Sequence, residues 1–314
     1  MTDMRKVAFL FAGQGAQTVG MGRDFADTVP ESGAVFSMGE ALRTGITQIC
    51  FGTGSPMDGA LLGQTAYTQP CLFLTDLAIA EAFRAVGLLP AAVAGFSLGE
   101  IPAAAFAGVL SYEEAFRFVL LRAESMAWQS GRHPGGMAAA LKLAPEVVEE
   151  ICSRFSEVWP VNYNCPGQVS CAGSAAEIDD FCAAVRQAGG RAVKLPVSGA
   201  FHTPYMAQVA PVLRAALDGA DVSAPAIPLY ANRTASPYPA DRAGILDCMT
   251  LQVCSPVRWE STLRAMWTAG ITTFVEVGAG HTLTGFVSRT LPEARALTVN
   301  DIPSFEAVCR ELTE

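Results

Sequence analysis

Short apolar runs that stop at or beside glycine alternate with longer helical patterns along most of the chain. Three of the runs have the length and composition of buried strands: Val7–Phe11, Ala91–Ala94 and Thr273–Val277. Helical spacing of apolar positions is found at Gln69–Val86, Tyr112–Trp128, Ala207–Leu217 and Trp259–Ala269. Strands that alternate with helices predict an α/β architecture with a mainly parallel sheet.

The stretch from residue 132 to residue 197 follows a different pattern. Strands are predicted at Met137–Leu143, Val161–Asn164, Gln168–Gly173 and Arg191–Val197, and helices at Pro145–Phe155 and Ala175–Ala188. This β-α-β-β-α-β order is typical of a small ferredoxin-like unit. We therefore expect residues 132–197 to form a small subdomain, inserted into a large subdomain made of residues 1–131 and 198–314.

The composition is that of a folded protein with few charges. The chain has 314 residues, of which 51% are hydrophobic and 16% charged, so a disordered chain is excluded. The formal net charge of −9 argues against nucleic acid as a partner, because binding to a phosphate backbone needs a basic surface. A small anionic substrate remains compatible with this charge, since one buried arginine is enough to bind it.

The sequence contains no clear export or membrane signal. The apolar run Val7–Phe11 is too short for the core of a signal peptide. The longest apolar stretch, Leu88–Leu110, is interrupted by Pro90, Glu100 and Pro102, which argues against a membrane span. The nine cysteines show no C-x-x-C spacing, so neither a disulfide framework nor a zinc site is predicted. We expect reduced thiols and a cytoplasmic protein.

The segment Gly95-Phe-Ser-Leu-Gly99 matches G-x-S-x-G in the setting of a nucleophile elbow. It follows a short apolar strand and precedes a helical segment, so the hydroxyl of Ser97 is expected at a sharp strand-to-helix turn. The backbone N–H of Leu98 then points toward a developing oxyanion. The alternative is a glycine-rich turn with an ordinary serine, and the strand–turn–helix context favours the nucleophile.

A serine nucleophile needs a base, and the chain has only three histidines. His133 lies in a connector rich in glycine and proline, which indicates a surface loop. His281 follows a strand end, where capping of the next helix is the simpler interpretation. His202 lies in the loop that ends an apolar segment, a position suited to a catalytic base, and it is the histidine we select.

Six segments, in order along the chain, resemble the signatures of malonyl-CoA:acyl carrier protein transacylases. The six are Phe11-Ala-Gly-Gln-Gly-Ala-Gln17, Gly95-Phe-Ser-Leu-Gly-Glu100, Asn162-Tyr-Asn-Cys-Pro-Gly-Gln168, Val197-Ser-Gly-Ala-Phe-His202, Leu251-Gln252 with Pro256-Val-Arg-Trp259, and Glu276-Val-Gly-Ala-Gly280. Together they cover nearly the whole chain. The resemblance implies an α/β-hydrolase-like core with the inserted ferredoxin-like subdomain, and no metal or cofactor.

The resemblance also implies a ping-pong reaction with two partners, malonyl-CoA and an acyl carrier protein. Ser97 would take the malonyl group, and His202 would move the protons and help to activate the phosphopantetheine thiol of the carrier. The main-chain carbonyl of Gln252 would orient the histidine. The backbone N–H groups of Gln14 and Leu98 would form the oxyanion hole. The product would supply extender units for fatty-acid synthesis.

Arg122 is the residue that selects the substrate in this interpretation. It lies in the apolar run Phe118-Val-Leu-Leu-Arg-Ala of a predicted helix. From the residues alone, an arginine whose charge reaches the surface is the simpler explanation. The family resemblance reverses this, because it implies a bidentate pair with the free malonyl carboxylate. Asn164 is a weaker candidate for lining the substrate cleft, and it also fits an Asn-Cys-Pro turn.

The chain departs from the family pattern at several positions. Phe96 replaces the usual histidine before the nucleophile, so hydrogen bonding beside the serine and acyl selectivity are in doubt. Ala12 and Ala279 replace prolines. Pro102 falls early in the helix after Ser97, where a missing N–H is tolerated.

Three alternatives remain open. A serine hydrolase or thioesterase would need an acid between Ser97 and His202, and Asp179 and Asp180 are the residues to consider, although they also fit the polar start of a helix. A discrete polyketide-synthase acyltransferase would share the chemistry and differ in its carrier protein. A non-catalytic module that binds carrier proteins is disfavoured because Ser97, His202 and Arg122 are all present.

Overall fold

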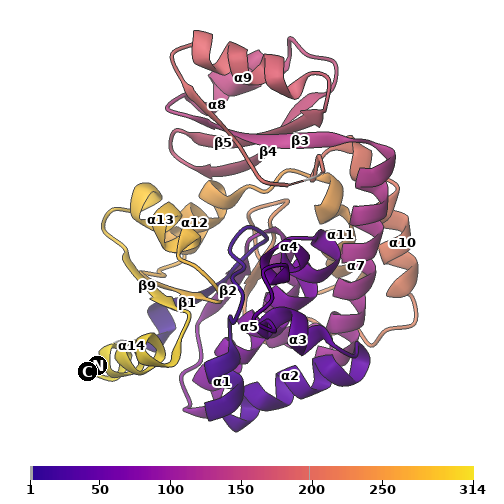
Figure 1. Cartoon of the computed structure of the whole chain (residues 1–314). Coiled ribbons are helices and arrows are strands. Elements are labelled where there is room, and N and C mark those ends of the chain that lie inside the picture. Colours follow the sequence, from indigo (N-terminus) through magenta and orange to yellow (C-terminus); the bar gives the residue numbers. More distant parts are fainter. Residues whose placement is uncertain (1–2, 198) are drawn as a thin grey trace.

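The computed structural model describes residues 3–197 and 199–314, which form two units around two sheets (Figure 1). The larger sheet has five parallel strands in the order β7-β2-β1-β8-β9. Their bounds are β1 Val7–Phe11, β2 Ala92–Gly95, β7 Leu229–Tyr230, β8 Thr273–Val277 and β9 Arg295–Val299. The predicted α/β class with a mainly parallel sheet is confirmed.

The central strands of this sheet are buried on both faces, which explains their continuous apolar sequences. All five residues of β1 are buried, as are all five of β8. Phe11 at the end of β1 pairs with Gly95 of β2 and with Val277 of β8. The loops that follow these three strands therefore leave the same edge of the sheet and meet there.

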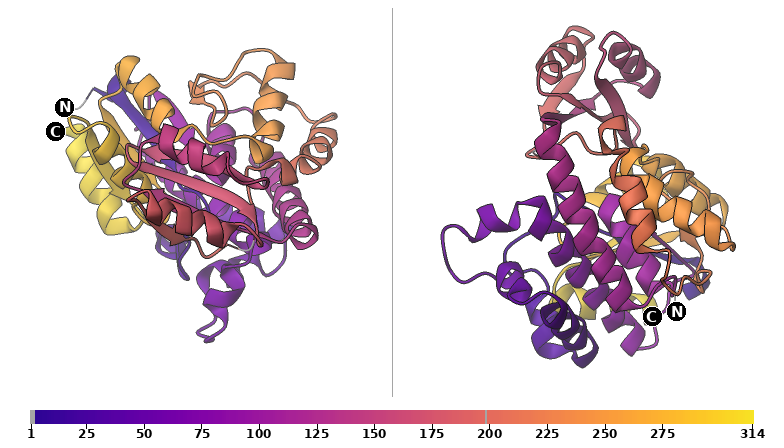
Figure 2. Two further views of the ribbon diagram at one scale, coloured as in Figure 1. Left: turned by 90° about the horizontal axis from the view of Figure 1, so that it is seen from above. Right: turned by 90° about the vertical axis from the view of Figure 1, so that its right-hand side faces the viewer.

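Helices cover both faces of the sheet, as the two further views show (Figure 2). The first half of the chain supplies α1 Arg23–Thr28, α2 Pro30–Leu42, α3 Ile46–Phe51, α4 Asp58–Leu62, α5 Thr65–Ala85, α6 Glu100–Phe106 and α7 Tyr112–Arg132. The second half supplies α10 Val209–Ala216, α11 Arg242–Leu251, α12 Trp259–Thr268, α13 Thr282–Thr290 and α14 Ile302–Thr313. Short 3-10 turns lie at Met4–Lys6, Ser97–Gly99, Pro204–Met206 and Gln252–Cys254.

Helix α5 runs through the middle of the large unit and begins four residues before the predicted start at Gln69. Pro70 lies inside the helix and has no N–H to donate to the carbonyl of Ala66. The Arg43 side chain donates to that carbonyl instead, at 3.1 Å. A tertiary contact thus satisfies the acceptor that proline leaves free, and the helix continues on both sides of it.

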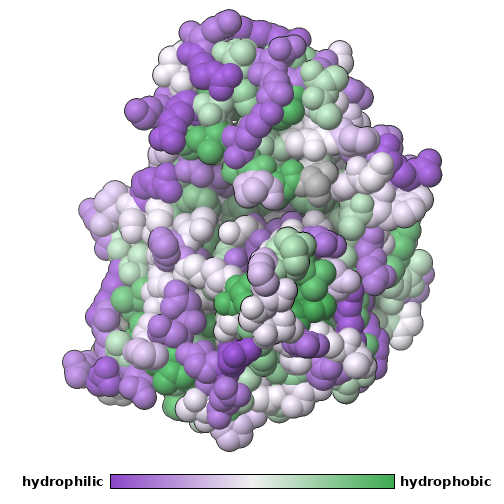
Figure 3. All heavy atoms as spheres, viewed as in Figure 1, coloured by the Kyte–Doolittle hydropathy of each residue, from purple (hydrophilic) through white to green (hydrophobic). Residues whose placement is uncertain are grey.

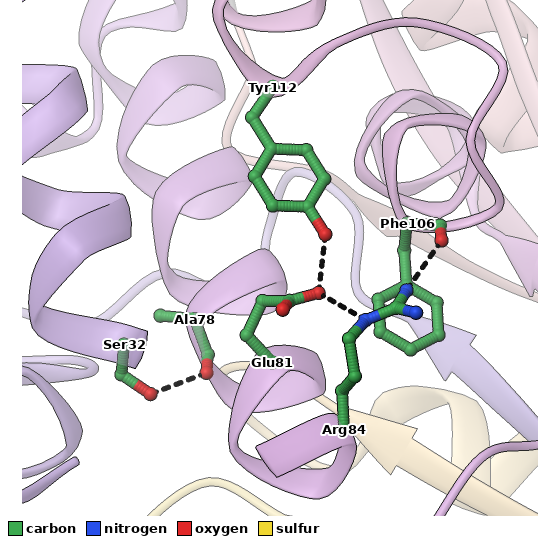
Figure 4. A network of polar contacts seen from close by, with 6 residues as sticks. All are labelled: Ser32, Ala78, Glu81, Arg84, Phe106 and Tyr112. Atoms are coloured by element: carbon green, nitrogen blue, oxygen red, sulfur yellow. Dashed lines mark hydrogen bonds and ion pairs between the residues drawn. The ribbon is translucent and has the colours of Figure 1, made fainter. Parts of the chain in front are cut away.

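A partly buried polar cluster connects α5 with the end of α6 and the start of α7 (Figure 4). Glu81 accepts hydrogen bonds from the hydroxyl of Tyr112 and from Nε of Arg84, the latter at 2.9 Å. Arg84 also donates to the carbonyl of Phe106 at 2.8 Å, and its guanidinium lies over the Phe106 ring. Each polar group thus meets a partner beside the apolar core, as buried polar groups require.

The second sheet has four antiparallel strands in the order β4-β5-β3-β6. Its strands are β3 Gly135–Leu141, β4 Val158–Cys165, β5 Gln168–Ser174 and β6 Arg191–Lys194, and its helices are α8 Pro145–Cys152 and α9 Ile178–Gln187. The two helices cover one face, as Figure 1 shows for this upper unit. The predicted β-α-β-β-α-β order is confirmed. Residue 198, where the second predicted boundary falls, lies outside the described residues, as does residue 1.

The open face of this small sheet looks toward the large unit. A bridge between Asn162 and Val257 and another between Pro134 and Gly199 connect the two units. The surface is recessed between them, and white and green spheres of intermediate and hydrophobic residues lie along the recess (Figure 3). The small unit thus forms one wall of a cleft whose other wall is the loop edge of the parallel sheet.

Within residues 3–197 and 199–314, every helix is too short or too polar to cross a lipid bilayer. All nine cysteines lie in this part of the chain and are free thiols, and seven of them are buried. Burial raises the pKa of several of these thiols, including that of Cys248 to about 12. They behave as small apolar residues of the core.

Candidate active site

Ser97 lies at a strained turn between β2 and the following helix. Its φ of 52° is positive, which a residue with a side chain adopts only when its surroundings hold it there. A Cβ at Gly95 would collide with the backbone of Gly99, and a Cβ at Gly99 would collide with the carbonyl of Phe11. The two glycines of G-x-S-x-G are therefore required by close backbone contact. The predicted strand–turn–helix context of the motif is confirmed.

His202 lies against the serine hydroxyl, with 2.7 Å between Nε2 and Oγ of Ser97. Its Nδ1 is 2.9 Å from the carbonyl of Gln252 and 3.1 Å from that of Ser255. Because carbonyls only accept, Nδ1 carries the proton and Nε2 is left to accept one from Ser97. Burial, together with the nearby charge of Arg122, lowers the pKa of His202 to about 4. The imidazole is therefore neutral at pH 7, as a general base must be.

The geometry does not form the Ser–His–acid triad of a hydrolase. The orienting groups at Nδ1 of His202 are two main-chain carbonyls. Asp179, the acid that a triad would have used, is exposed on α9 and pairs with Lys194 of β6. The acidic start of α9 is thus a surface feature of the small unit.

Arg122 is fully buried on α7 and its guanidinium lies beside the hydroxyl of Ser97. Its Nη1 donates to Oε1 of Gln69 at 2.7 Å and its Nη2 to Oε1 of Gln252 at 2.9 Å. Nη2 is also 3.4 Å from Oγ of Ser97. Burial lowers the pKa of Arg122 to about 10, with Glu100 acting in the opposite direction, so the guanidinium stays charged at neutral pH. Among the described residues it makes no ion pair with a carboxylate.

Gln14 and Leu98, the predicted oxyanion donors, lie in the loops after β1 and β2. The side chain of Gln14 donates to Oγ1 of Thr65 at 3.1 Å, so its backbone is anchored at the cleft. A Cβ at Gly13 would collide with the carbonyl of Phe96, which shows how closely the two loops approach. Leu98 directly follows the nucleophile in the short 3-10 turn, and its side chain is buried beneath it.

Asn164 lies on β4 and faces the cleft from the small unit. Its Nδ2 donates to Oγ of Ser170 at 3.2 Å, while its buried Oδ1 has no partner. Asn162 on the same strand likewise has an unpaired buried Oδ1, and both residues line the cleft. Two unsatisfied acceptors on one wall are suited to a ligand that donates hydrogen bonds. Asn164 belongs to a strand rather than to the turn that also fitted its sequence.

The other two histidines lie away from the nucleophile. His133 is exposed at the end of α7, where its ring stacks on Tyr205 at 5.0 Å between centroids. His281 occupies the N-cap position of α13, but its side chain makes no capping bond. The carboxylate of Glu276 accepts from the N–H groups of Leu283 and Thr284 instead. The capping role predicted for His281 was therefore wrong, because the preceding strand supplies a stronger acceptor.

Four polar residues of the site were missed by the sequence interpretation: Gln69, Glu100, Asn232 and Tyr238. Glu100 is fully buried, and it accepts from the Tyr238 hydroxyl, from Asn232 N at 3.0 Å and from Nε2 of Gln252 at 2.8 Å. Burial raises the pKa of Glu100 to about 7. One signal was present, because a charge within the apolar Leu88–Leu110 stretch needs a partner, as Arg122 does.

The cleft that these residues border has a volume of about 230 Å³. It is bordered at one end by Ser97 and His202, and Phe96 lines it with its ring edge-to-face against Trp259 at 5.4 Å. The position of the family histidine is thus filled by an apolar ring. Its remaining walls include Ala12, Gly13, Gln14, Gln69, Met126, Met137, Asn162, Asn164, Gln168, Ser170, Phe201, Leu283 and Phe286.

A family model described as an acyl transferase domain matches residues 8–310 of this chain. The chain belongs to the acyl transferase family. A malonyl CoA-acyl carrier protein transacylase of Bacillus subtilis (strain 168) is 33% identical over 317 residues, which are 99% of this chain and 98% of that protein. The resemblance inferred from the six segments is confirmed, and this member of the family is an enzyme of the acyltransferase class.

Solved structures of the acyl transferase family agree with this placement. The structure of a malonyl CoA-acyl carrier protein transacylase from Clostridium perfringens has a TM-score of 0.91 and 33% identity, covering 98% of this chain and 97% of that one. A malonyl-transacylase in complex with its type II PKS acyl-carrier protein has a TM-score of 0.92 and 29% identity, covering 98% of this chain and 99% of that one. The fold is therefore shared over essentially the full length of these acyltransferases.

Proposed function

We propose that this protein transfers the malonyl group from malonyl-CoA to the phosphopantetheine thiol of an acyl carrier protein, through a malonyl ester on Ser97. The transfer supplies extender units for fatty-acid synthesis. The observation that carries the proposal is the buried Arg122, whose Nη2 lies 3.4 Å from Oγ of Ser97 and whose side-chain partners are neutral amides. A charged guanidinium beside the nucleophile favours an acyl group that ends in a carboxylate.

The first half-reaction forms the malonyl ester. Oγ of Ser97 attacks the thioester carbonyl while its proton passes to Nε2 of His202, 2.7 Å away. The oxyanion is stabilised by the N–H groups of Gln14 and Leu98. When the carbon–sulfur bond breaks, the departing sulfur takes the proton from His202, and the imidazole is neutral again.

The second half-reaction runs the same steps with the carrier's thiol. The thiol gives its proton to Nε2 of His202 and attacks the ester carbonyl, and Oγ of Ser97 recovers the proton as it leaves. The Ser97–His202 pair therefore serves both halves of a ping-pong cycle. The carbonyls of Gln252 and Ser255 hold the ring in one orientation throughout and stabilise its charged form.

Arg122 acts on the remote end of the acyl group. Because its partners Gln69 and Gln252 are uncharged, its positive charge is left for the malonyl carboxylate, and a reorientation of the Gln69 amide opens the guanidinium to the substrate while Gln252 stays in place. Asn164 and Asn162 present acceptors toward the cleft, where the amides of a pantetheine arm are donors. Residues 132–197, as a small subdomain, provide this wall.

One alternative to a role in fatty-acid synthesis is a role as a discrete polyketide-synthase acyltransferase. It is favoured by the likeness to the malonyl-transacylase solved with its type II PKS acyl-carrier protein. Transfer rates to a panel of fatty-acid and polyketide carrier proteins decide between the two. The nine free thiols favour work in the reducing cytoplasm for either pathway.

Mass spectrometry of the intact protein tests the proposal directly. After mixing with malonyl-CoA, the wild-type protein gains one malonyl group, and Ser97→Ala gains none. The adduct disappears when a carrier protein with its phosphopantetheine arm is added, and the carrier gains the same mass. A wild-type protein that stays unmodified would contradict the mechanism.

A further inference from the structure

The strained nucleophile turn is held on both sides by side-chain amides. The N–H of Ser97 donates to Oδ1 of Asn232 at 2.7 Å. Its carbonyl accepts from Nε2 of Gln252 at 2.8 Å. A positive φ at a residue with a side chain persists only when such contacts over-determine it. The two amides therefore fix the direction of the Ser97 hydroxyl.

Each amide works in one orientation only, because turning it by 180° exchanges its donor and its acceptor. A turned Gln252 would place Oε1 against the carbonyl of Ser97 and an NH₂ group against Arg122. Asn232 is fixed by its own second bond, from Nδ2 to the carbonyl of Gly95 at 2.6 Å. Gln252 has no such main-chain partner for its second donor hydrogen, and the group that accepts it is Glu100, at 2.8 Å.

Glu100 itself is held by two partners from the loop that follows β7. The Tyr238 hydroxyl donates to Oε1, and the backbone N–H of Asn232 donates to Oε2 at 3.0 Å. The carboxylate is fully buried and lies behind the site, where it borders no part of the cleft. It thus touches neither the reacting atoms nor the substrate.

We propose that Glu100 is a positioning residue for acyl transfer, which fixes the side-chain amide of Gln252 and so sets both the Ser97 carbonyl and the Arg122 guanidinium. The Gln252 amide bonds to the Glu100 carboxylate, to the Ser97 carbonyl and to the Arg122 guanidinium. Glu100 therefore acts through this one amide on both the nucleophile turn and the arginine proposed to bind the malonyl carboxylate. The inference rests on the proposed function for its substrate, and on the described contacts alone for the geometry.

Glu100→Met is the first test, because it removes both acceptor oxygens and keeps the length of the side chain. We expect kcat/KM for malonyl transfer to fall about 100-fold, as for a misplaced catalytic group, with a rise in KM for malonyl-CoA as well as a fall in kcat. Labelling of Ser97 by a fluorophosphonate, which needs no carboxylate site, slows too. Glu100→Gln restores both rates to within about threefold, because Oε1 accepts both N–H bonds and Nε2 donates to Tyr238.

The matched controls come from the Glu81 cluster, where a second buried glutamate accepts from a tyrosine. Glu81→Met lowers the melting temperature but leaves both rates of the folded protein unchanged. Where Glu100→Met does not fold, Tyr238→Phe is compared with Tyr112→Phe, each of which removes one hydroxyl. We expect about a fivefold loss of malonyl transfer for Tyr238→Phe and none for Tyr112→Phe.

Two outcomes overturn the inference: folded Glu100→Met or Tyr238→Phe with wild-type kinetics, or equal losses in the Glu81-cluster controls. Failure of the proposed function gives a different result. In that case the wild-type protein forms no malonyl adduct, while the fluorophosphonate still labels Ser97 and still reports whether Glu100→Met slows it.

Discussion

The molecule has two clusters in which a glutamate accepts a hydrogen bond from a tyrosine and lies near an arginine. The clusters differ in whether the glutamate and the arginine are in direct contact. In the cluster of Figure 4, Glu81 pairs directly with Arg84 at 2.9 Å, and the guanidinium also covers the Phe106 ring. In the active site, Glu100 is separated from Arg122 by the amide of Gln252, which bonds to both. The same residue types thus give a direct ion pair in one place and, in the other, an arginine whose nearest carboxylate is separated from it by an amide.

The difference shows how a fold keeps a buried charge available for a ligand. Arg84 is neutralised where it stands and contributes to holding helices together. The amides of Gln69 and Gln252 each accept a hydrogen bond from the guanidinium of Arg122 without neutralising its charge, and its buried Nε has no partner. In the proposed function, a substrate carboxylate would bond directly to this guanidinium, on which Glu100 acts only through space.

The largest expected difference between the two clusters is the effect of removing Arg122 or Arg84. The first substitution should affect malonyl transfer and the second should affect stability. Arg122→Ala is expected to lower kcat/KM for malonyl transfer by about 10³-fold, because the substrate carboxylate loses its buried partner, with a much smaller effect on acetyl transfer. Arg84→Ala is expected to leave transfer by the folded protein unchanged and to lower the free energy of unfolding by about 1 kcal/mol. Steady-state kinetics with malonyl-CoA and acetyl-CoA measure the transfer rates of both variants, and thermal unfolding measures their stability. Equal losses of malonyl and acetyl transfer in Arg122→Ala would remove the carboxylate role.

Gln69→Glu should convert the active-site arrangement into that of the other cluster. The new carboxylate would lie where Oε1 now accepts from Nη1 of Arg122 at 2.7 Å, and it would neutralise the guanidinium internally. We expect a loss of about 30-fold in kcat/KM for malonyl-CoA, mostly through KM, and little change for acetyl-CoA. The reciprocal Glu81→Gln leaves transfer intact. An unchanged KM for malonyl-CoA in Gln69→Glu would show that the charge of Arg122 does not select the substrate.

The pH profile should reflect the burial of His202 beside Arg122. The pKa of about 4 lies below the ordinary histidine value of 6.5, so the imidazole of His202 stays neutral as the pH falls from 8 to about 5. The rate of Ser97 malonylation is then expected to fall roughly tenfold for each pH unit below 4. Over the window from 6.5 down to 4, the unfolded chain binds the proton first, so folding stability declines. Stopped-flow measurement of the acylation rate above and below pH 4 tests the expected midpoint. A midpoint of the rate profile near 6.5 would contradict the lowered pKa of His202.

The smallest expected effect is a change in folding stability on substitution of a third buried carboxyl group, that of Asp76. Asp76 on α5 is fully buried, and burial together with the nearby Glu276 raises its pKa well above 3.8, while the backbone N–H of Ala12 acts in the opposite direction. A raised carboxyl pKa means that stability is lost as the pH rises past the unfolded value, so Asp76→Asn should stabilise the protein by about 1 kcal/mol at pH 7 and less at pH 4. Thermal unfolding at the two pH values provides the measurement. A destabilised variant at pH 7 would contradict a net cost of burying this carboxyl group.

Much of the fold and the nucleophile-elbow geometry at Ser97 could be predicted because the signals are local. Burial on both faces makes β1 a continuous apolar run, and the G-x-S-x-G turn is required by backbone contacts within five residues. The start of α5 was missed because it depends on Arg43, which lies just after the end of α2 and satisfies the Ala66 carbonyl. The role of Glu276 at α13 was missed in the same way, because a side chain on a strand does the capping.

By itself the sequence determined the two-unit α/β organisation, the elbow at Ser97 and the choice of His202 among three histidines. Only the tertiary structure decided how the charge of Arg122 is kept free and how Glu100, Asn232 and Gln252 hold the turn. The physical reason is the distance along the chain between the residues that interact. Strand and helix patterns come from the burial of neighbouring residues, whereas the bond between Gln252 and Glu100 joins positions 152 residues apart and depends on distances of a few tenths of an ångström.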